Sequence, residues 1–369
     1  MDDSDSVKPA NAICLNRGVL NPKRGCCLKL GLWNIRGLGQ GDKLHSILSD
    51  AIARNLNVVV LTETRFFGRT CLGLDGGHTL YNSGATNDQR TNGGVGFLVC
   101  AGRDSAPHVV KFEGLSERVA TLVLDHKGAR FGVCAAYAPT ESSPSDYFKE
   151  VFYKELAAAY SSLKRVCKTV FVLGDFNCRL GRDAHSLAPK VVGTGGFDGV
   201  PTSENGLRVL DFCKANGLRV WNTWFKRKRV RRNTWYHPAT KRGAMLDLVL
   251  GPVGVKTCKF KDVRVCRSAE GGDSDHYLVT ALVWLPCGGR AKFVRAARGG
   301  RYGHRRRWPT SSAGIRLSTK MSSRVSFKML SVMRTLSGPL VGRLRRYDQK
   351  CRESGLGRGT RSRGKPWPL

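Results

Sequence analysis

Short apolar runs rich in Val, Ile, Leu and Phe recur along the chain from Leu28 onwards, and Gly, Asn or Asp residues bound them. Runs of this length and composition are typical of buried β-strands. They cover residues 28–35, 57–64, 93–100, 108–112, 118–125, 129–137, 169–177, 244–251 and 275–285. The pattern therefore predicts a protein built on β-sheets.

Three segments between these runs carry helical signals. A helix is expected over residues 42–54, a second over 145–164, and a third over 203–216 between Ser203 as N-cap and Gly217. The runs between 93 and 137 follow one another without a helix, so they should pair antiparallel. The sequence thus predicts an α/β fold in which two mixed sheets pack face to face with helices outside.

The apolar pattern is confined to the middle of the chain. Residues 1–27 lack periodicity and are expected to be a loose leader, and residues 28–286 are expected to form the folded domain. Residues 287–369 hold 22 Lys and Arg residues and two acidic ones. A basic amphipathic signal at 325–347 could bind a membrane or a partner. The charge and glycine content favour a disordered basic tail instead.

Charge and cysteine usage narrow the class of protein. The formal net charge of +34 calls for a polyanionic partner, with nucleic acid first and an anionic membrane surface second. The 13 Cys residues form no C-x-x-C pair and no zinc-site spacing, which is typical of reduced thiols in the cytosol or nucleus. No secretory signal or membrane-length apolar run is visible. We expect an intracellular, nuclear protein, monomeric and without an obligate protein partner.

Polar residues stand at the ends of several apolar runs, where layered α/β proteins build their sites. They are Asn34, Arg36, Glu63, Tyr137, Asp175, Asn177 and Asp247, together with Asp275 and His276, which precede their strand. Carboxylates with amides suit Mg²⁺ or Mn²⁺, and a single His beside Asp suits phosphoester chemistry. Each residue alone also has a structural interpretation, such as an Asx-turn in G-D-F-N or a solvated loop at S-D-H. Their order along the chain is the informative feature.

This ordered set resembles the endonuclease/exonuclease/phosphatase superfamily over about residues 28–285. The matching motifs are W-N-I-R-G at 33–37, L-T-E-T-R at 61–65, Y-A-P at 137–139, G-D-F-N at 174–177, T-W-Y to M-L-D-L-V-L within 234–250, and S-D-H at 274–276. The resemblance implies a four-layer α/β/β/α sandwich. It also implies a metal-dependent phosphodiesterase.

The resemblance also assigns roles to the residues. Glu63 and Asn34 would lie at the metal, with Asp275 near it. Asp175 would activate or orient the attacking water, and Asn177 would position the phosphate. Tyr137 would support the phosphate or the leaving group. The scissile phosphate would contact His276, which Asp247 would orient. Within the superfamily the chain is most similar to the apurinic-type endonuclease domains of non-LTR retrotransposons and to craniofacial development protein 2-like proteins.

Two departures and two rival functions bear on this interpretation. Thr140 follows Y-A-P where repair AP endonucleases carry Asn, and A-M-L precedes Asp247 where relatives often have a polar residue and Ile.

One rival function is a phosphoesterase acting on phosphoinositides or sphingomyelin, and the other is a non-catalytic nucleic-acid or chromatin-binding protein. The motifs favour a DNA endonuclease that nicks its substrate.

The basic run at 226–232 also favours DNA. On a hairpin loop near the site, these residues would contact DNA phosphates, although a nuclear-localisation patch or a solvated loop fits the same charges. The expected contacts are Lys226, Arg227, Lys228, Arg229, Arg231 and Arg232. Arg36 and Trp235 complete this group, although a Trp in N-T-W-Y is more often a packing residue.

Overall fold

The computed structural model describes residues 25–39, 42–85, 92–101, 106–143, 145–195, 197–254 and 258–287. The predicted tail at 287–369 therefore lies outside the described residues except for Cys287, as do residues 1–24 of the predicted leader. The first strand begins at Gly25, three residues before the expected domain boundary. No described helix is long and apolar enough to cross a membrane.

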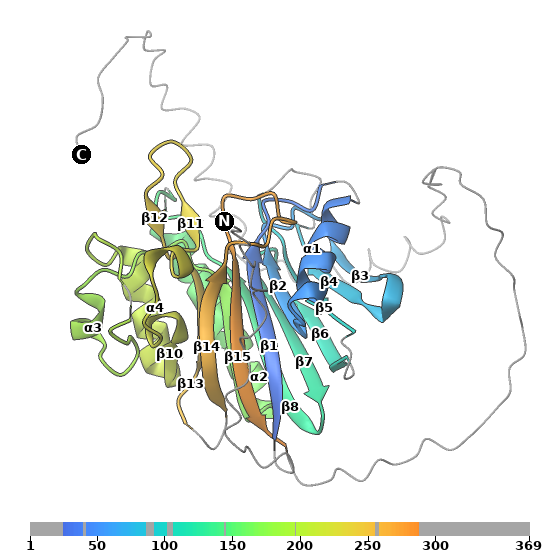
Figure 1. The fold of residues 1–369 in the computed structure, drawn as a ribbon. Coiled ribbons are helices and arrows are strands. Elements are labelled where there is room, and N and C mark those ends of the chain that lie inside the picture. Colours follow the sequence, from blue (N-terminus) through green and yellow to red (C-terminus); the bar gives the residue numbers. More distant parts are fainter. Residues whose placement is uncertain are drawn as a thin grey trace, which may run out of the picture. The chain divides into compact units, whose positions relative to one another are not determined.

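Two large sheets form the body of the protein (Figure 1). The seven-stranded sheet has the order β14-β15-β1-β2-β5-β4-β3. Its strands are β1 (Gly25–Asn34), β2 (Val58–Thr62), β3 (Arg69–Gly73), β4 (Thr79–Ser83), β5 (Val95–Val99), β14 (Lys259–Cys266) and β15 (Leu278–Pro286). Only β1 and β2 pair parallel in this sheet, and α1 (Asp42–Ala53) connects them.

The six-stranded sheet has the order β10-β13-β9-β8-β7-β6. Its strands are β6 (His108–Gly114), β7 (Val119–His126), β8 (Ala129–Tyr137), β9 (Thr169–Asp175), β10 (Leu218–Val220) and β13 (Asp247–Pro252). Here β8 and β9 pair parallel, and α2 (Asp146–Val166) connects them. Both sheets are therefore mixed, as the sequence predicted, and each parallel pair is joined by a helical crossover.

Alternation along the strands divides the apolar residues among three layers of core. In β2, Val58 and Val60 face the layer between the sheets, whereas Val59 and Leu61 face α1. On the other side, α2 and α4 (Glu204–Asn216) cover the six-stranded sheet. This arrangement confirms the four-layer α/β/β/α sandwich and two mixed sheets.

All three expected helices form close to the predicted bounds. The Ser145 side chain caps α2, the Ser203 side chain caps α4, and Gly217 ends α4 in the left-handed conformation with φ 62°. The remaining short elements are α3 (Ala184–Leu187), η1 (Asp75–Gly77), η2 (Trp221–Thr223) and η3 (Arg229–Arg231), and the hairpin of β11 (Trp235–Tyr236) with β12 (Gly243–Ala244).

The glycine before Asp175 is required by close packing between β8 and β9. A Cβ built on Gly174 would lie 2.0 Å from the carbonyl oxygen of Ala136. Because β8 and β9 carry Tyr137 and Asp175 side by side, this contact also sets the spacing of the site.

We expect Gly174→Ala to lower the free energy of unfolding by about 1–3 kcal/mol, because the added methyl group forces the two strands apart. Urea unfolding followed by circular dichroism measures this. Gly199→Ala is the control, since nothing lies within 4 Å of its Cβ and its φ is not positive. Equal stabilities for the two variants would contradict the packing argument.

Candidate active site

The polar residues picked out in the sequence converge at one rim of the sandwich. Asn34, Tyr137 and Asp175 are the last residues of β1, β8 and β9, and Asp247 is the first of β13. The register places Asp175 directly between Tyr137 and Asp247 on neighbouring strands. Glu63 follows β2, next to Asn34 on β1, so each sheet presents its polar residues at the same edge.

Three hydrogen bonds at this rim join one sheet to the other. The Asn34 amide donates to Asp175 Oδ2 at 2.9 Å, and the Tyr137 hydroxyl donates to Glu63 Oε1 at 3.1 Å. The third joins His276 Nδ1 and Asp247 Oδ2 at 2.8 Å. Each of these bonds pairs a residue of the seven-stranded sheet or its loops with one of the six-stranded sheet. The site is therefore built across the seam between the sheets.

Glu63 is a buried carboxylate surrounded by hydrogen-bond donors. Besides the Tyr137 hydroxyl, its oxygens accept from the Asn34 amide at 2.8 Å and from Arg65 at 2.9 Å. Burial raises the pKa of Glu63, but the hydrogen bonds from Asn34, Arg65 and Tyr137 outweigh burial, so the pKa lies below its ordinary value. Glu63 is therefore a stable anion at neutral pH.

Asp175, Asp247 and His276 form a second, fully buried group. One ligand atom from each of the three lies within 4.8 Å of the others. Burial and the charge of Asp247 raise the pKa of Asp175 to about 6. Burial lowers the pKa of His276, but the charge and hydrogen bond of Asp247 outweigh it and raise the pKa to about 9. Asp247 Oδ1 is buried and has no hydrogen-bond partner among the described residues.

Several site residues adopt the left-handed backbone conformation, which residues other than glycine rarely adopt. Arg36, Glu63 and Asn177 have φ of 47°, 51° and 45°. Asn177 is held there from both sides, since its main-chain N–H donates to Asp175 Oδ1 at 2.9 Å and its amide donates to Ala138 O at 2.9 Å. Left-handed residues at strand ends are typical of functional sites, where the surrounding structure maintains the strain.

Asp275 has different bonding partners from Glu63. Its side chain makes an ion pair with Arg36 at 2.7 Å and accepts from Trp235 Nε1 at 2.7 Å. The Trp235 ring is tilted against the His276 ring, with centroids 6.3 Å apart. The structure thus brings Arg36, Trp235 and Asp275 together beside His276, and a metal-ligand role for Asp275 stays a prediction.

The basic run at 226–232 precedes a hairpin and does not lie on one. It continues from η2 and includes η3, and the hairpin of β11 and β12 follows. Arg227 pairs with Asp262 of β14, and Arg232 donates to Phe197 O at 3.1 Å. Two of the cations are therefore engaged within the protein, and a DNA contact by Lys226, Lys228, Arg229 and Arg231 stays a prediction.

The structure adds residues that the sequence did not single out. Arg65 binds Glu63, and the Arg118 guanidinium stacks on the Tyr137 ring at 5.1 Å. The Ser274 hydroxyl donates to Asn34 O at 2.8 Å and accepts from the His276 N–H at 3.1 Å. Asn205 donates to the carbonyls of Pro139 and Asn177. Arg65 and Ser274 lie inside motifs already identified, whereas Arg118 lies in none of them.

The donors at this rim fit a hard divalent cation. Glu63 and Asp175 offer carboxylate oxygens, which Mg²⁺ and Mn²⁺ prefer, whereas the Asn34 amide oxygen accepts from the Arg36 N–H at 3.1 Å. Glu63 accepts three hydrogen bonds, and a carboxylate has about four acceptor positions, so one is left for an ion. Asp175, Asp247 and His276 are the cluster of possible metal ligands found among the described residues, and it includes no cysteine. Its one histidine, His276, already binds Asp247 through Nδ1.

Comparison with known protein families agrees with this geometry. The family model for the endonuclease/exonuclease/phosphatase family matches residues 31–276, which is more than half of the chain. The chain belongs to the endonuclease/exonuclease/phosphatase family. The matched range contains every residue of the rim described above, from Asn34 to His276.

Individual relatives are distant. Craniofacial development protein 2 from Tragulus javanicus is 25% identical over 286 residues, covering 75% of this chain and 46% of the relative. The chain thus spans less than half the length of that protein. The APE2 catalytic domain of Xenopus laevis shares the fold with a TM-score of 0.52 and 17% identity, covering 71% of this chain and 94% of that domain.

The endonuclease domain of TRAS1, a telomere-specific non-LTR retrotransposon, matches with a TM-score of 0.47 and 11% identity. This match covers 70% of this chain and 98% of that one. The predicted resemblance to the superfamily and to craniofacial development protein 2 is confirmed.

The Asp247–His276 pair gives a direct test of the electrostatics. In metal-free protein we expect Asp247→Asn to lower the pKa of His276 from about 9, because the charge that raises it is gone and the effect of burial remains. NMR titration of the His276 ring measures this shift.

Asp198→Asn is the control for that titration. Asp198 is also a buried aspartate, and its ion pair is with Arg179, so the pKa of His276 should not move. An unchanged His276 pKa in Asp247→Asn would contradict the assignment of its cause.

Proposed function

We propose that this chain is a divalent-metal-dependent phosphodiesterase that nicks DNA. The observation that carries the proposal is one connected group of buried polar residues. The Asn34 amide links Glu63 to Asp175, and Asp175 lies within one cluster with Asp247 and His276. Such a group supplies an anion for a metal ion, a base for water and a cation for phosphate at one place.

His276 provides the cation in this proposal. Asp247 occupies Nδ1, which fixes the ring and leaves Nε2 to face a substrate. With a pKa of about 9 the ring carries its proton at neutral pH. Nε2–H then donates to a non-bridging oxygen of the scissile phosphate and stabilises charge that develops there.

Asp175 provides the base. Its Oδ1 accepts from the main chain of Asn177 and its Oδ2 from Asn34, so its orientation is fixed on both sides. A pKa of about 6 lies close to neutral pH, which suits a carboxylate that takes a proton from attacking water. The Asn177 amide has a second N–H beyond the one given to Ala138 O, and this one positions the phosphate.

Glu63 would hold the metal ion, with Asn34 beside it. When bound, a divalent cation polarises a phosphoryl oxygen and steadies the negative charge of the transition state. Tyr137 and Arg65 keep the Glu63 carboxylate ionised and oriented through the bonds described above. Arg36 remains partly exposed beside the group and can meet a neighbouring phosphate.

DNA is favoured as the substrate by charge around the rim. The hairpin of β11 and β12 stands out beyond the ends of the sheets (Figure 1), and it carries the exposed residues Lys241 and Arg242. Trp235 at its base bonds to Asp275 beside His276. Cations held next to the hydrolytic group bind backbone phosphates and set the register of a nucleic acid.

The proposal is tested by nicking of supercoiled plasmid with Mg²⁺. We expect wild-type protein to convert plasmid to open circles, and Asp175→Asn or His276→Ala to slow this by at least ~100-fold, the usual contribution of an acid or base. EDTA should abolish cleavage. A wild-type protein that binds plasmid without cutting it would overturn the proposal, and phosphoinositide hydrolysis would then be measured.

Glu63→Gln separates metal binding from the other roles. We expect it to raise the Mg²⁺ concentration that gives half-maximal cleavage, because the carboxylate loses its charge. Glu150→Gln is the control, since Glu150 lies on α2 and, among the described residues, forms its ion pair with Lys154. An unaltered Mg²⁺ dependence in Glu63→Gln would show that Glu63 does not hold the ion.

A further inference from the structure

The loop that follows β2 exposes two consecutive phenylalanine rings next to the candidate site. Phe66 is 39% and Phe67 is 50% exposed, and both lie in the segment 63–69, which we call the rim loop. Arg65 precedes them and Arg69 follows them at the start of β3. Large apolar rings in water next to a functional group mark an interaction surface more often than scattered single ones do.

The rim loop is held in place along its length. Thr64 N–H donates to Gly94 O at 3.0 Å, Arg65 N–H to Gly93 O at 2.9 Å, and Gly68 N–H to Ala85 O at 2.8 Å. The buried Asn82 side chain accepts from the Thr64 hydroxyl and donates to the carbonyls of Phe66 and Gly68. The fold therefore fixes the backbone that presents the two rings, so their exposure does not come from a loose loop.

The strand register gives the position of the rings. Asn34 lies beside Thr62, Thr62 beside Val95, Val95 beside Ser83, and Ser83 beside Arg69. Four strand spacings separate Asn34 from Arg69, which is roughly 19 Å along the rim. The rim loop begins after Thr62 and crosses three of these spacings, roughly 14 Å, with Glu63 at one end, the two rings between, and Arg69 at the other.

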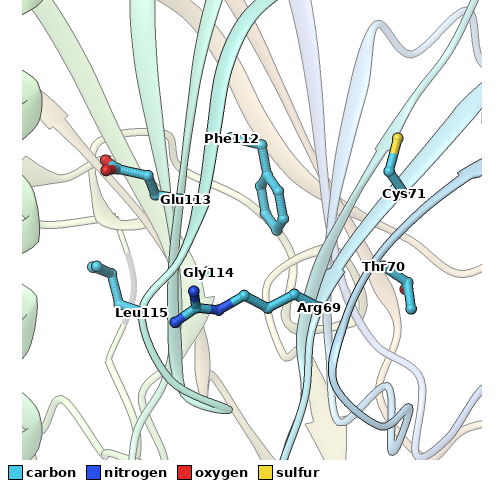
Figure 2. Close-up of a pocket in the computed structure, with 7 residues that line it drawn as sticks. All are labelled: Arg69, Thr70, Cys71, Phe112, Glu113, Gly114 and Leu115. Atoms are coloured by element: carbon cyan, nitrogen blue, oxygen red, sulfur yellow. The ribbon is translucent and has the colours of Figure 1, made fainter. Parts of the chain in front are cut away.

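Arg69 extends the row to the edge of the sandwich. Figure 2 shows its side chain reaching from β3 toward Gly114, the last residue of β6 in the other sheet, and Arg69 and Phe112 both line the pocket there. The described ion pairs of this pocket leave Arg69 without an acidic partner, because Glu113 pairs with Lys111. A cation is thus available at the far end of the two rings.

We propose that Phe66 and Phe67 stack on unpaired nucleobases of the DNA strand next to the cleaved bond, and that Arg69 binds a backbone phosphate of the same strand. This inference rests on the proposed function and names its preferred substrate as DNA with locally unpaired bases. A protein ring can stack on a base only where that base has lost its stacking neighbour in the strand. Such stacking tolerates any base sequence. Flanking arginines favour a nucleic acid over an apolar protein surface.

The test is equilibrium binding of the full chain in EDTA, measured by fluorescence anisotropy. Three probes are compared: a 20-mer duplex, the same duplex with three mismatched pairs, and the single strand. Phe66→Leu with Phe67→Leu should weaken binding of the mismatched and single-stranded probes at least ~10-fold, since stacking contributes on the order of 5- to 150-fold per base. Binding of the perfect duplex should change less than threefold.

Two matched variants control for folding and for apolar area. Phe66→Tyr with Phe67→Tyr keeps the rings and should bind within about twofold of wild type. Tyr147→Leu with Phe148→Leu removes two rings of α2 that are 68% and 58% exposed, and should have no effect. The loss caused by the Leu variant should be the same at all salt concentrations, whereas Arg69→Ala should reduce the salt slope by about 0.7.

If wild type and the Leu variant bind each of the three probes with the same affinity, the inference is wrong. So would nicking of mismatched and perfect duplexes at the same rate by both proteins in Mg²⁺. Failure of the proposed function is seen separately, because wild type would then cut no probe while its ring-dependent binding in EDTA remained.

Discussion

The Asn34 amide group is the contact on which the candidate site depends. It is fully buried, and its nitrogen donates to Glu63 on one side of the sheet seam and to Asp175 on the other. Carboxylates brought together in a dry interior repel each other and lose hydration, so each needs compensating donors. The amide, the Tyr137 hydroxyl, Arg65 and His276 supply them. The candidate site can therefore form only when both sheets are packed in register.

The strand order places the last strand of the domain, β15, inside the seven-stranded sheet. Strand β15 lies between β14 and β1, so the residues just before it reach the rim beside Asn34. Ser274 binds the Asn34 carbonyl, and Trp33 Nε1 donates to His276 O at 3.0 Å. Residues far apart in the sequence thus fix each other's backbone, and the orientation of His276 is set from three sides.

Much of the fold and of the candidate site could be predicted from the sequence, because both depend on local sequence patterns. Buried strands appear as apolar runs, and capping residues such as Ser203 and Gly217 mark helix ends. The site residues could be predicted because they follow those runs in a recognisable order. Edge elements were less visible. Strand β3 is mostly exposed, β4 buries the polar residues Asn82 and Ser83, and β14 carries charged residues, so none of them shows a continuous apolar run.

Contacts between distant segments were not predictable in the same way. The pairing of Asp275 with Arg36 and Trp235, and of Arg227 with Asp262, depends on how loops fold back over the strands. The sequence analysis therefore places the basic run on a hairpin loop, although the hairpin of β11 and β12 forms after it. The exposed rings of the rim loop became informative only when their fixed backbone and their distance from Glu63 were known.

The central claim is that this rim hydrolyses a phosphodiester by direct attack of water. Cleavage of DNA in H₂¹⁸O with Mg²⁺, followed by mass spectrometry of the product ends, tests it most directly. The account predicts one ¹⁸O atom on the terminal phosphate of each nick and no product in EDTA. Ends without ¹⁸O, as a β-elimination at the sugar would leave, or cleavage that persists in EDTA, would contradict it.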